Sequence, residues 1–511
     1  MSDSSATAAL PPPEERKLLA DTGKLSSATA ASHVVNLAGG LIVAGILTPA
    51  AWGVWKYVQI IMLYTGFANF GATNGLDRSC PALVSKGKLS LYRRFLGASL
   101  AFSTLISVAI GTVFLVLGIV MPSGHWRTAF LALSVLVVLQ PFFQHGEAAL
   151  SSEKRFGAKA TAIVGSTLVR IGASVAAAFF FGLAGVLAVF AFTLIVTTAY
   201  MFSRTDYGWP FQAFRQMRLH LPRGIIRVGL PITLLAFAEQ IFLTTDKWIV
   251  GGVFGEAIGG FYLFAFFPLP VLLMVPSALR QIISIDVYDK YSRLRRIEPC
   301  RDVFERSVMA IALGSPVLIG AVYLGMPWII EFLLEQYRPS IPTLKLHAIA
   351  VFPILISQTA LPIVVITRRV KGVVMGYLAV TALAGAVSCW FLATVPGASM
   401  IGVVLIHGIA WGLFSAALMA ITLVWLGDSV GWAAWRVVRW LIPMAYLAVE
   451  LPALEWLLVR LGLTPHTFIY GAGGGVLHLL ACAPFLWMLE RRIKGVSFVL
   501  NSLARRLGKR A

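Results

Sequence analysis

Apolar residues in this chain gather into long runs, and short polar stretches separate one run from the next. A helix needs about 20 apolar residues to cross the hydrocarbon core of a bilayer, so each run predicts one membrane-spanning helix. The pattern predicts an all-α polytopic membrane protein with about fourteen such helices. The predicted spans are residues 28–48, 54–76, 95–121, 126–146, 158–181, 183–203, 225–250, 258–283, 305–327, 343–367, 372–394, 400–426, 438–459 and 468–489.

Composition supports the same fold class. Hydrophobic residues make up 58% of the 511 residues and charged residues only 13%, whereas charged residues make up about a quarter of a typical soluble domain. No soluble domain of any size fits between the apolar runs. Residues 1–27 contain three consecutive prolines and no apolar core. We therefore expect a disordered tail there rather than a cleaved signal peptide.

Basic residues are distributed very unevenly between the loops. Basic residues at the ends of spans are counted here with the adjoining loops. On this count, the first tail and alternate loops hold 35 Lys and Arg residues and the opposite loops hold 4, and the remaining 3 (Lys56, Arg170 and Lys247) are counted inside predicted spans. Loops on the cytoplasmic side of a membrane protein carry an excess of basic residues. The distribution therefore predicts that both termini are cytoplasmic. It also explains most of the net charge of +20 without a nucleic-acid partner.

The cysteines and the missing catalytic motifs limit the chemistry. Four cysteines fall on the predicted cytoplasmic side or inside spans, at positions 80, 300, 389 and 482, so no disulfide framework is expected. The sequence lacks a nucleotide-binding P-loop, CxxC and HExxH metal motifs and a GxSxG nucleophile motif. ATP-driven transport and standard hydrolase chemistry have no support, and we expect neither enzymatic activity nor a cofactor.

A weak internal repeat divides the chain into two lobes. Residues 46–57 (ILTPAAWGVWKY) and 252–264 (GVFGEAIGGFYLF) both combine small residues with a Gly that precedes an aromatic residue by two positions. Gly-rich turns between spans are predicted in three places, at 180–190, 251–259 and 395–406. Because six spans is an even number, the lobes would share one orientation in the membrane. The predicted parts are a tail (1–27), a first lobe (28–203), a cytoplasmic linker (204–224), a second lobe (225–426), an extra helix pair (427–489) and a basic cytoplasmic tail (490–511).

Four segments resemble one family of transporters. They are LTPAAWGVWKYVQ (47–59), GLDRSCPALVSKGK (75–88), TTDKWIVGGVFGEAIGGFYLFA (244–265) and WIIEFLLEQYRPSIPTLKL (328–346). Together with the predicted number of spans, they resemble the oligosaccharide flippases of the multidrug/oligosaccharidyl-lipid/polysaccharide (MOP) exporter superfamily. The resemblance covers roughly residues 30–490.

The resemblance implies a function, a location and partners. It implies a bacterial inner-membrane flippase that translocates oligosaccharides linked to undecaprenyl diphosphate for O-antigen or exopolysaccharide synthesis. It implies two six-helix lobes around a central cavity that opens alternately to each side of the membrane, without covalent catalysis. Membrane lipids, a polysaccharide polymerase and export proteins are the implied partners.

Arg170 is the clearest candidate for substrate binding. It lies near the middle of its predicted span, and Ser166 and Ser174 lie four residues before and after it on the same helix face. A charge at that depth is costly and usually faces a cavity, and a guanidinium can bind a diphosphate through two parallel hydrogen bonds. The alternative is an Arg that pairs with a buried Glu or with carbonyls and joins two helices.

The other candidate cations lie nearer the ends of their spans. Lys56 is flanked by aromatic residues, so it either reaches the membrane interface or contributes to the cavity. The same two interpretations apply to Lys247, for which the adjacent Asp246 is a natural partner. Arg78 and Arg280 lie at the cytoplasmic exits of equivalent helices, where they either ring the inner mouth or contact anionic headgroups.

Glu239 and Asp246 are the candidate coupling residues. They are seven residues apart, so they share one helix face at a separation of about 10 Å. They either relay a proton or another cation, or they pair with Arg170 and Lys247 as structural ion pairs. The sequence leaves these two roles open.

Two other functions share parts of this pattern. A MATE-like multidrug antiporter has the same architecture, but it needs carboxylates in its cavity to hold cationic drugs. The first lobe instead has Arg170 and no acid within its spans apart from their edges. A membrane-bound polymerase or ligase needs a sizeable outer loop with reactive groups, and the longest predicted outer loop is only residues 328–342.

Overall fold

The computed structural model describes residues 13–206, 223–463 and 468–493, and these residues contain helices and turns but no strand. The first half comprises α1 (Pro13–Ile46), α2 (Pro49–Gly66), α3 (Ala72–Ser85), α4 (Leu89–Val120), α5 (His125–Ser152) and α6 (Phe156–Ser203). The second half begins with α8 (Arg223–Phe266), α9 (Leu269–Leu294), α10 (Arg301–Leu333), α11 (Ile341–Ala350), α12 (Phe352–Ser357) and α13 (Leu361–Ile366). It ends with α14 (Val370–Thr394), α15 (Met400–Trp425), α16 (Val430–Arg460), α17 (Phe468–Ala481) and α18 (Ala483–Ile493), and the short 3-10 helices are η1 (Glu298–Cys300), η2 (Glu335–Ser340) and η3 (Gln358–Ala360).

Many of these helices are suited to a bilayer. Within the described residues, 9 helices are long and apolar enough to cross a membrane, or up to 10 if the bent pair α17–α18 counts as one span. The predicted all-α, multi-pass membrane fold is therefore confirmed. The number of fourteen crossings stays a prediction, as does the cytoplasmic linker, most of which lies outside the described residues.

Glycines fold two of the longest helices back on themselves. The 48 residues of α6 would extend about 72 Å if straight, far more than one crossing requires. The backbone leaves the helical region at Gly182 (φ 57°) and, in α8, at Gly255 (φ 82°), conformations that glycine adopts without a steric penalty. A Cβ atom on Gly259 would lie 3.1 Å from Gly251 Cα, so α8 reverses direction there. These turns confirm the predictions for 180–190 and 251–259.

Other predicted spans are interrupted. The single helix predicted over 54–76 is divided into α2 and α3, with left-handed backbone at Phe70 and Gly71. A Cβ atom on Gly71 would lie 2.5 Å from the α8 backbone at Leu230, so glycine allows α3 to pack directly on α8. The equivalent helix over 258–283 is likewise divided beside Pro268, and the helix over 343–367 is divided into α11, α12 and α13. Proline cannot donate the helical hydrogen bond, which favours such breaks.

The predicted disordered tail is also partly wrong. Helix α1 begins at Pro13, whereas the sequence pattern starts the first span at residue 28. The extra segment contains Glu, Lys, Leu and Ala, which favour helix, and proline is well suited to the first helical position. Low hydropathy made this segment resemble a tail although its helix propensity is high.

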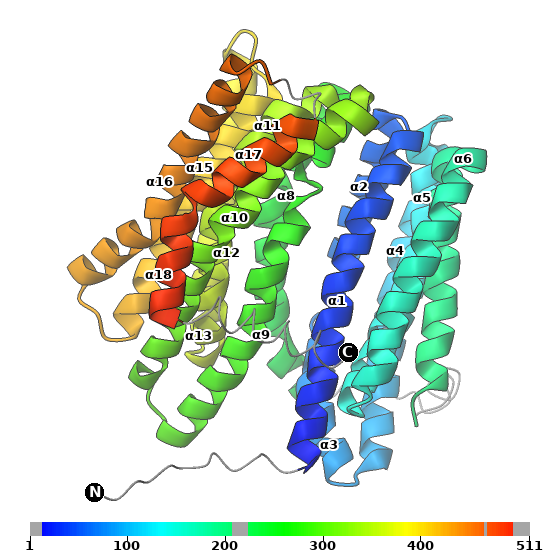
Figure 1. Ribbon diagram of the computed structural model, residues 1–511. Coiled ribbons are helices and arrows are strands. Elements are labelled where there is room, and N and C mark those ends of the chain that lie inside the picture. Colours follow the sequence, from blue (N-terminus) through cyan, green and yellow to red (C-terminus); the bar gives the residue numbers. More distant parts are fainter. Residues whose placement is uncertain (1–12, 207–222, 464–467, 494–511) are drawn as a thin grey trace, which may run out of the picture.

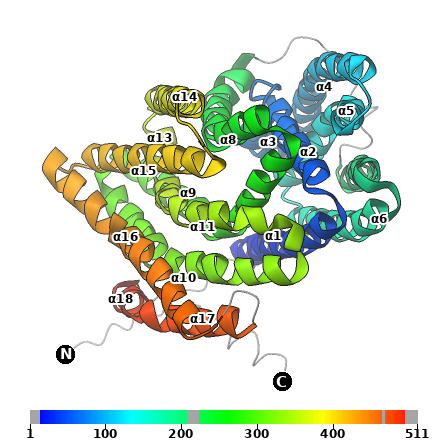
Figure 2. The same ribbon diagram turned by 90° about the horizontal axis from the view of Figure 1, so that it is seen from above.

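The two halves lie side by side and touch along α2 and α8 (Figures 1 and 2). A Cβ atom on Gly53 would lie 2.8 Å from Gly260 Cα, so two glycines let these helices approach closely. The Tyr57 hydroxyl donates to the Lys247 carbonyl at 2.6 Å. Helices α16, α17 and α18 lie along the outside of the second half, against α10 (Figure 2).

Candidate functional site

A cavity of about 350 Å³ lies in the first half of the molecule, between α1, α2 and α6. It contains both of the candidate cations that the sequence predicts inside the spans of the first lobe, Arg170 and Lys56. None of the described residues that line it is acidic. The lining residues are Asn36, Gly39, Gly40, Val43, Trp52, Trp55, Lys56, Gln59, Met62, Arg170, Ile171, Ser174, Val186, Phe190 and Phe267. We call this the first-lobe cavity.

Arg170 is held by a neutral partner. Its Nη2 donates to Asn36 Oδ1 at 2.7 Å, and its guanidinium carbon lies 5.7 Å from the centre of the Phe190 ring. No carboxylate of the described chain lies within ion-pair distance of Arg170, which argues against a pair with a buried Glu. The hydrogen bond to the side-chain carbonyl of Asn36 does join α6 to α1, as the other form of that alternative expects. The charge therefore remains available to an anion in the cavity, and Asn36 orients it.

Lys56 lies in an aromatic and amide environment. Its Nζ is 4.5 Å from the centre of Trp52 and 4.3 Å from the centre of Phe267, and it donates to Gln59 Oε1 at 3.1 Å. Aromatic faces attract a cation without neutralising it. Two cations thus share one cavity with neutral partners only.

The serine stripe is only partly in the cavity. Ser174 lines it, whereas the Ser166 hydroxyl donates to the Ile163 carbonyl of its own helix at 3.0 Å. The shared helix face predicted for Ser166, Arg170 and Ser174 therefore extends beyond the cavity. Ser166 does not contribute to its lining.

A second cavity of about 400 Å³ lies in the other half, between α8, α9 and the η3–α13 segment, and we call it the second-lobe cavity. It contains one acid and one base, joined by a neutral amide. Gln358 Nε2 donates to Glu239 Oε1 at 2.6 Å, and Arg280 Nη1 donates to Gln358 Oε1 at 2.7 Å. Glu239 therefore does not pair with Arg170, which corrects that part of the ion-pair alternative.

Four exposed cations surround a third and larger cavity of about 870 Å³, which we call the basic mouth. They are Arg78 from α3, Arg227 from α8, and Arg368 and Lys371 around the start of α14. Arg78 Nη2 also donates to the hydroxyl of Tyr288, a residue of the second-lobe cavity, at 3.0 Å. By the charge distribution of the loops, this mouth lies on the predicted cytoplasmic side.

Asp246 and Lys247 form a fully buried pair. Lys247 Nζ lies 3.2 Å from Asp246 Oδ1 and 3.4 Å from the centre of the Phe266 ring, and it donates to the Leu243 carbonyl at 2.5 Å. The Tyr262 hydroxyl donates to Asp246 Oδ2 at 2.7 Å. Neither charged residue lines any of the three cavities. Direct substrate contact by Lys247 and ion coupling by Asp246 therefore find no support in their placement, and the structural ion-pair alternative fits it.

Sequence reasoning missed the amides of these sites. Asn36, Gln59 and Gln358 all bond to a charged side chain in a cavity. Amides in apolar runs are a usable signal, because a polar group at membrane depth needs a partner. In the described part of the chain, no group of three or more His, Cys, Asp or Glu side chains could hold a metal ion.

Several solved transporters share this fold. The lipid II flippase MurJ in an inward closed conformation aligns with a TM-score of 0.62 over 92% of this chain and 99% of its own, at 14% identity. A MOP superfamily transporter from Pyrococcus furiosus aligns with a TM-score of 0.55 over 82% of this chain and 96% of its own, at 16% identity. An inward-facing MATE multidrug resistance transporter aligns with a TM-score of 0.54 over 80% of this chain and 95% of its own, at 14% identity. Such low identities show the fold alone.

The sequence itself matches a family. The comparison with curated proteins gives no match. A family profile described as "Polysaccharide biosynthesis protein" matches residues 42–342, which is more than half of the chain. The chain therefore has the fold of MOP superfamily transporters and belongs to this polysaccharide biosynthesis protein family.

Proposed function

We propose that this protein is a flippase that translocates oligosaccharides linked to undecaprenyl diphosphate across the bacterial inner membrane, for O-antigen or exopolysaccharide synthesis. The observation that carries the proposal is the first-lobe cavity, where Arg170 and Lys56 lie together without an acidic lining residue in the described chain. An uncompensated pair of cations at membrane depth is unfavourable unless water or an anion is present.

The chemistry of that substrate fits the cavity. A sugar diphosphate is too polar to cross about 30 Å of hydrocarbon alone. Arg170 would bind the diphosphate through its planar guanidinium, and Lys56 would add a second positive charge. The Trp52, Trp55 and Phe190 rings in the lining offer faces for sugars, while the polyprenyl chain stays in lipid.

The basic mouth would collect the substrate first. It lies between the lobes, since Arg78 belongs to α3 and the other three cations belong to α8 and the α13–α14 region. Four cations without an acidic lining residue among the described residues would attract the diphosphate from the cytoplasmic leaflet. The substrate would then enter the cavity between the lobes as they separate.

The breaks in α2–α3 and α8–α9 offer positions where the lobes could bend during alternating access. One break follows α2 and the other follows α8, the two helices that touch between the halves. Non-helical backbone of this kind at membrane depth is tolerated where it is packed in protein or lines a pathway. Glu239, in the second-lobe cavity, would couple this conformational change of the lobes to a proton or cation gradient.

The second candidate is a cation-coupled multidrug antiporter. The observation that favours it is Glu239, a carboxylate that lines the second-lobe cavity beside the aromatic Tyr288. The first-lobe cavity argues against it, because a cationic drug would meet two fixed cations there.

Two assays separate these functions. Polysaccharide export in a flippase-null strain should be restored by the wild type and by Arg460→Ala, and should be largely lost in Arg170→Ala. Expression of any of these three proteins in a pump-deficient strain should leave the efflux of the cationic dye ethidium unchanged. Normal export by a well-expressed Arg170→Ala would refute the proposal, and Arg170-independent ethidium efflux would establish the antiporter.

A further inference from the structure

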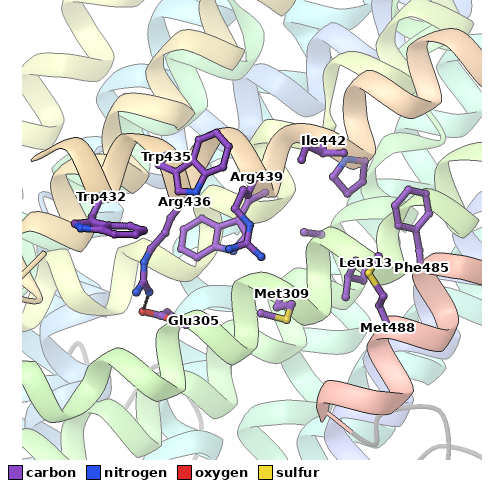
Figure 3. Close-up of a pocket in the computed structure, with 13 residues that line it drawn as sticks. Glu305, Met309, Leu313, Trp432, Trp435, Arg436, Arg439, Ile442, Phe485 and Met488 are labelled. Atoms are coloured by element: carbon purple, nitrogen blue, oxygen red, sulfur yellow. Dashed lines mark hydrogen bonds and ion pairs between the residues drawn. The ribbon is translucent and has the colours of Figure 1, made fainter. Parts of the chain in front are cut away.

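A cavity of about 380 Å³ lies away from the lobe interface, where α16 and α18 pack on α10 (Figure 3). None of the residues proposed above to bind or couple substrate lines it. The helix pair to which α16 and α18 belong also falls outside the internal repeat. This cavity is therefore separate from the proposed substrate-binding and coupling residues.

The cavity is polar at one end and apolar at the other. Glu305 and Arg436 meet at the polar end, and Leu313, Phe485 and Met488 form the apolar end, with Arg439 extending into the space between them (Figure 3). Glu305 and Leu313 are eight residues apart on α10, which places the two ends about 12 Å apart along that helix. A lipid has the same arrangement, because its polar headgroup is followed directly by its apolar acyl chain.

Among the described residues near the polar end of the cavity, one positive charge has no ion pair. Arg436 bonds to Glu305 and lies 3.5 Å from Asp428, and Arg301 Nη2 lies 2.5 Å from Asp428. Arg301 also donates to Glu305 at 2.7 Å, so two arginines and two acids neutralise one another. Arg439 has no hydrogen bond or ion pair within the described residues, and its side chain is exposed.

The outer wall of the cavity is suited to contact lipid. Trp432, Trp435 and Ile442 line it and are 64%, 54% and 54% exposed. Tryptophan is enriched at the level of the headgroups, where one part of the ring is apolar and the N–H is wet. Glu305 lies one turn from the start of α10, whose preceding loop is predicted to be cytoplasmic. The cavity therefore lies at the depth of the cytoplasmic headgroups.

We propose that this cavity binds one anionic phospholipid from the cytoplasmic leaflet. Its phosphate lies on Arg439 and its headgroup near the Arg436–Glu305 pair, while one acyl chain follows Phe485 and Met488. Basic pockets between transmembrane helices on the cytoplasmic side are suited to anionic headgroups. A zwitterionic lipid would neutralise Arg439 less, because its ammonium would add positive charge beside the arginines.

The test is the retention of phosphatidylglycerol by the purified full-length protein. The protein is taken from vesicles of phosphatidylcholine and phosphatidylglycerol into detergent, and bound lipid is counted by native mass spectrometry. Wild type should retain one phosphatidylglycerol in preference to phosphatidylcholine. Arg439→Gln should lower its affinity about tenfold, as expected for loss of a charge-assisted hydrogen bond, and Arg439→Lys should keep most of it.

Arg460→Gln is the matched control. Arg460 ends the same helix at the predicted opposite membrane face, its guanidinium carbon lies 4.3 Å from the centre of Trp456, and it does not line the cavity. This variant should retain phosphatidylglycerol like the wild type. Equal retention by Arg439→Gln and wild type would overturn the proposal, as would an equal loss in Arg460→Gln. Displacement by undecaprenyl diphosphate at the same affinity would also overturn it and assign the cavity to substrate.

Discussion

The two halves of this molecule have similar helices but differently charged cavities. In the first-lobe cavity, Arg170 and Lys56 bond to neutral amides, Asn36 and Gln59. In the second-lobe cavity, one neutral amide, Gln358, lies between an acid and a base, Glu239 and Arg280. The first cavity has a surplus of positive charge, and the second contains balanced charges.

The difference in charge suits the two cavities to different tasks. A surplus of positive charge in low dielectric favours an anion strongly, because nothing nearby competes for it. A balanced chain of hydrogen bonds is satisfied without a ligand, and it changes when its acid binds a proton. This difference supports the proposed division of roles, in which the first lobe holds the substrate and the second responds to a gradient.

Reversing the charge of the first-lobe cavity should have the largest effect. Arg170→Glu leaves Lys56 paired with an acid and removes the positive surplus. Losing a buried charge–charge contact costs about 2–5 kcal/mol, so transport should fall by about thirtyfold or more. Arg170→Lys keeps the charge but loses the planar fork, so it should keep partial activity. The measurement is the flipping rate of a lipid-linked oligosaccharide in proteoliposomes, and equal rates for the two variants would contradict the comparison.

Neutralising the acid of the second-lobe cavity should have a different kind of effect. Glu239→Gln keeps a side chain able to bond to Gln358, but it can no longer exchange a proton. Stimulation of flipping by an imposed gradient should disappear, while binding of substrate to the purified protein changes less than about twofold. Gln240→Ala, a change at a neighbouring position in the same cavity that leaves Glu239 in place, is the control and should keep the gradient stimulation. Gradient stimulation that survives in Glu239→Gln would show that the response lies elsewhere.

Much of this arrangement could be predicted from local sequence. Runs of apolar residues predict the helices, and Gly182 and Gly255 mark the turns because their backbone conformations suit glycine. The sequence singles out Arg170 by its depth in a span, whereas it leaves Lys56 between the membrane interface and the cavity. The partner of Glu239 could not be predicted from local sequence, because Gln358 is 119 residues away and comes close only after α8 and η3 pack together.

The choice between the two interpretations of Lys247 also depends on tertiary packing. Lys247 resembles Lys56 in sequence, since each lies in an apolar span beside aromatic residues. Tertiary packing gives the two lysines different partners. Asp246 forms an ion pair with the buried Lys247, whereas Lys56 contacts only an amide and aromatic rings. Removing one member of a buried pair costs about 3–5 kcal/mol. Asp246→Asn should therefore lower thermal stability rather than selectively reduce flipping.

Removing the second cation of the first-lobe cavity should have a moderate effect. Lys56→Gln leaves Arg170 in place, so the cavity keeps half of its positive charge. One charge-assisted hydrogen bond contributes about 1.5 kcal/mol, which predicts an apparent substrate affinity lower by about tenfold. Lys56→Arg should restore most of the affinity. Substrate titration in proteoliposomes measures this, and an unchanged affinity in Lys56→Gln would leave Arg170 as the only binding cation.

The smallest effect is expected at the basic mouth. Arg78 is exposed, and Arg227, Arg368 and Lys371 line the same cavity, so no single cation there is indispensable. An exposed charge contributes about 0.2–1 kcal/mol, which predicts a loss of initial flipping rate of at most about fivefold in Arg78→Gln. Because exposed charges are screened, raising the ionic strength should reduce the wild-type rate and narrow the difference between the wild type and Arg78→Gln.

Tyr288→Phe is the control, because it removes the hydrogen bond from Arg78 without removing the charge. If Tyr288→Phe slows flipping as much as Arg78→Gln does, Arg78 acts by joining α3 to α9 rather than by attracting substrate. A loss in Arg78→Gln as large as that in Arg170→Glu would mean that the mouth, and not the first-lobe cavity, holds the diphosphate.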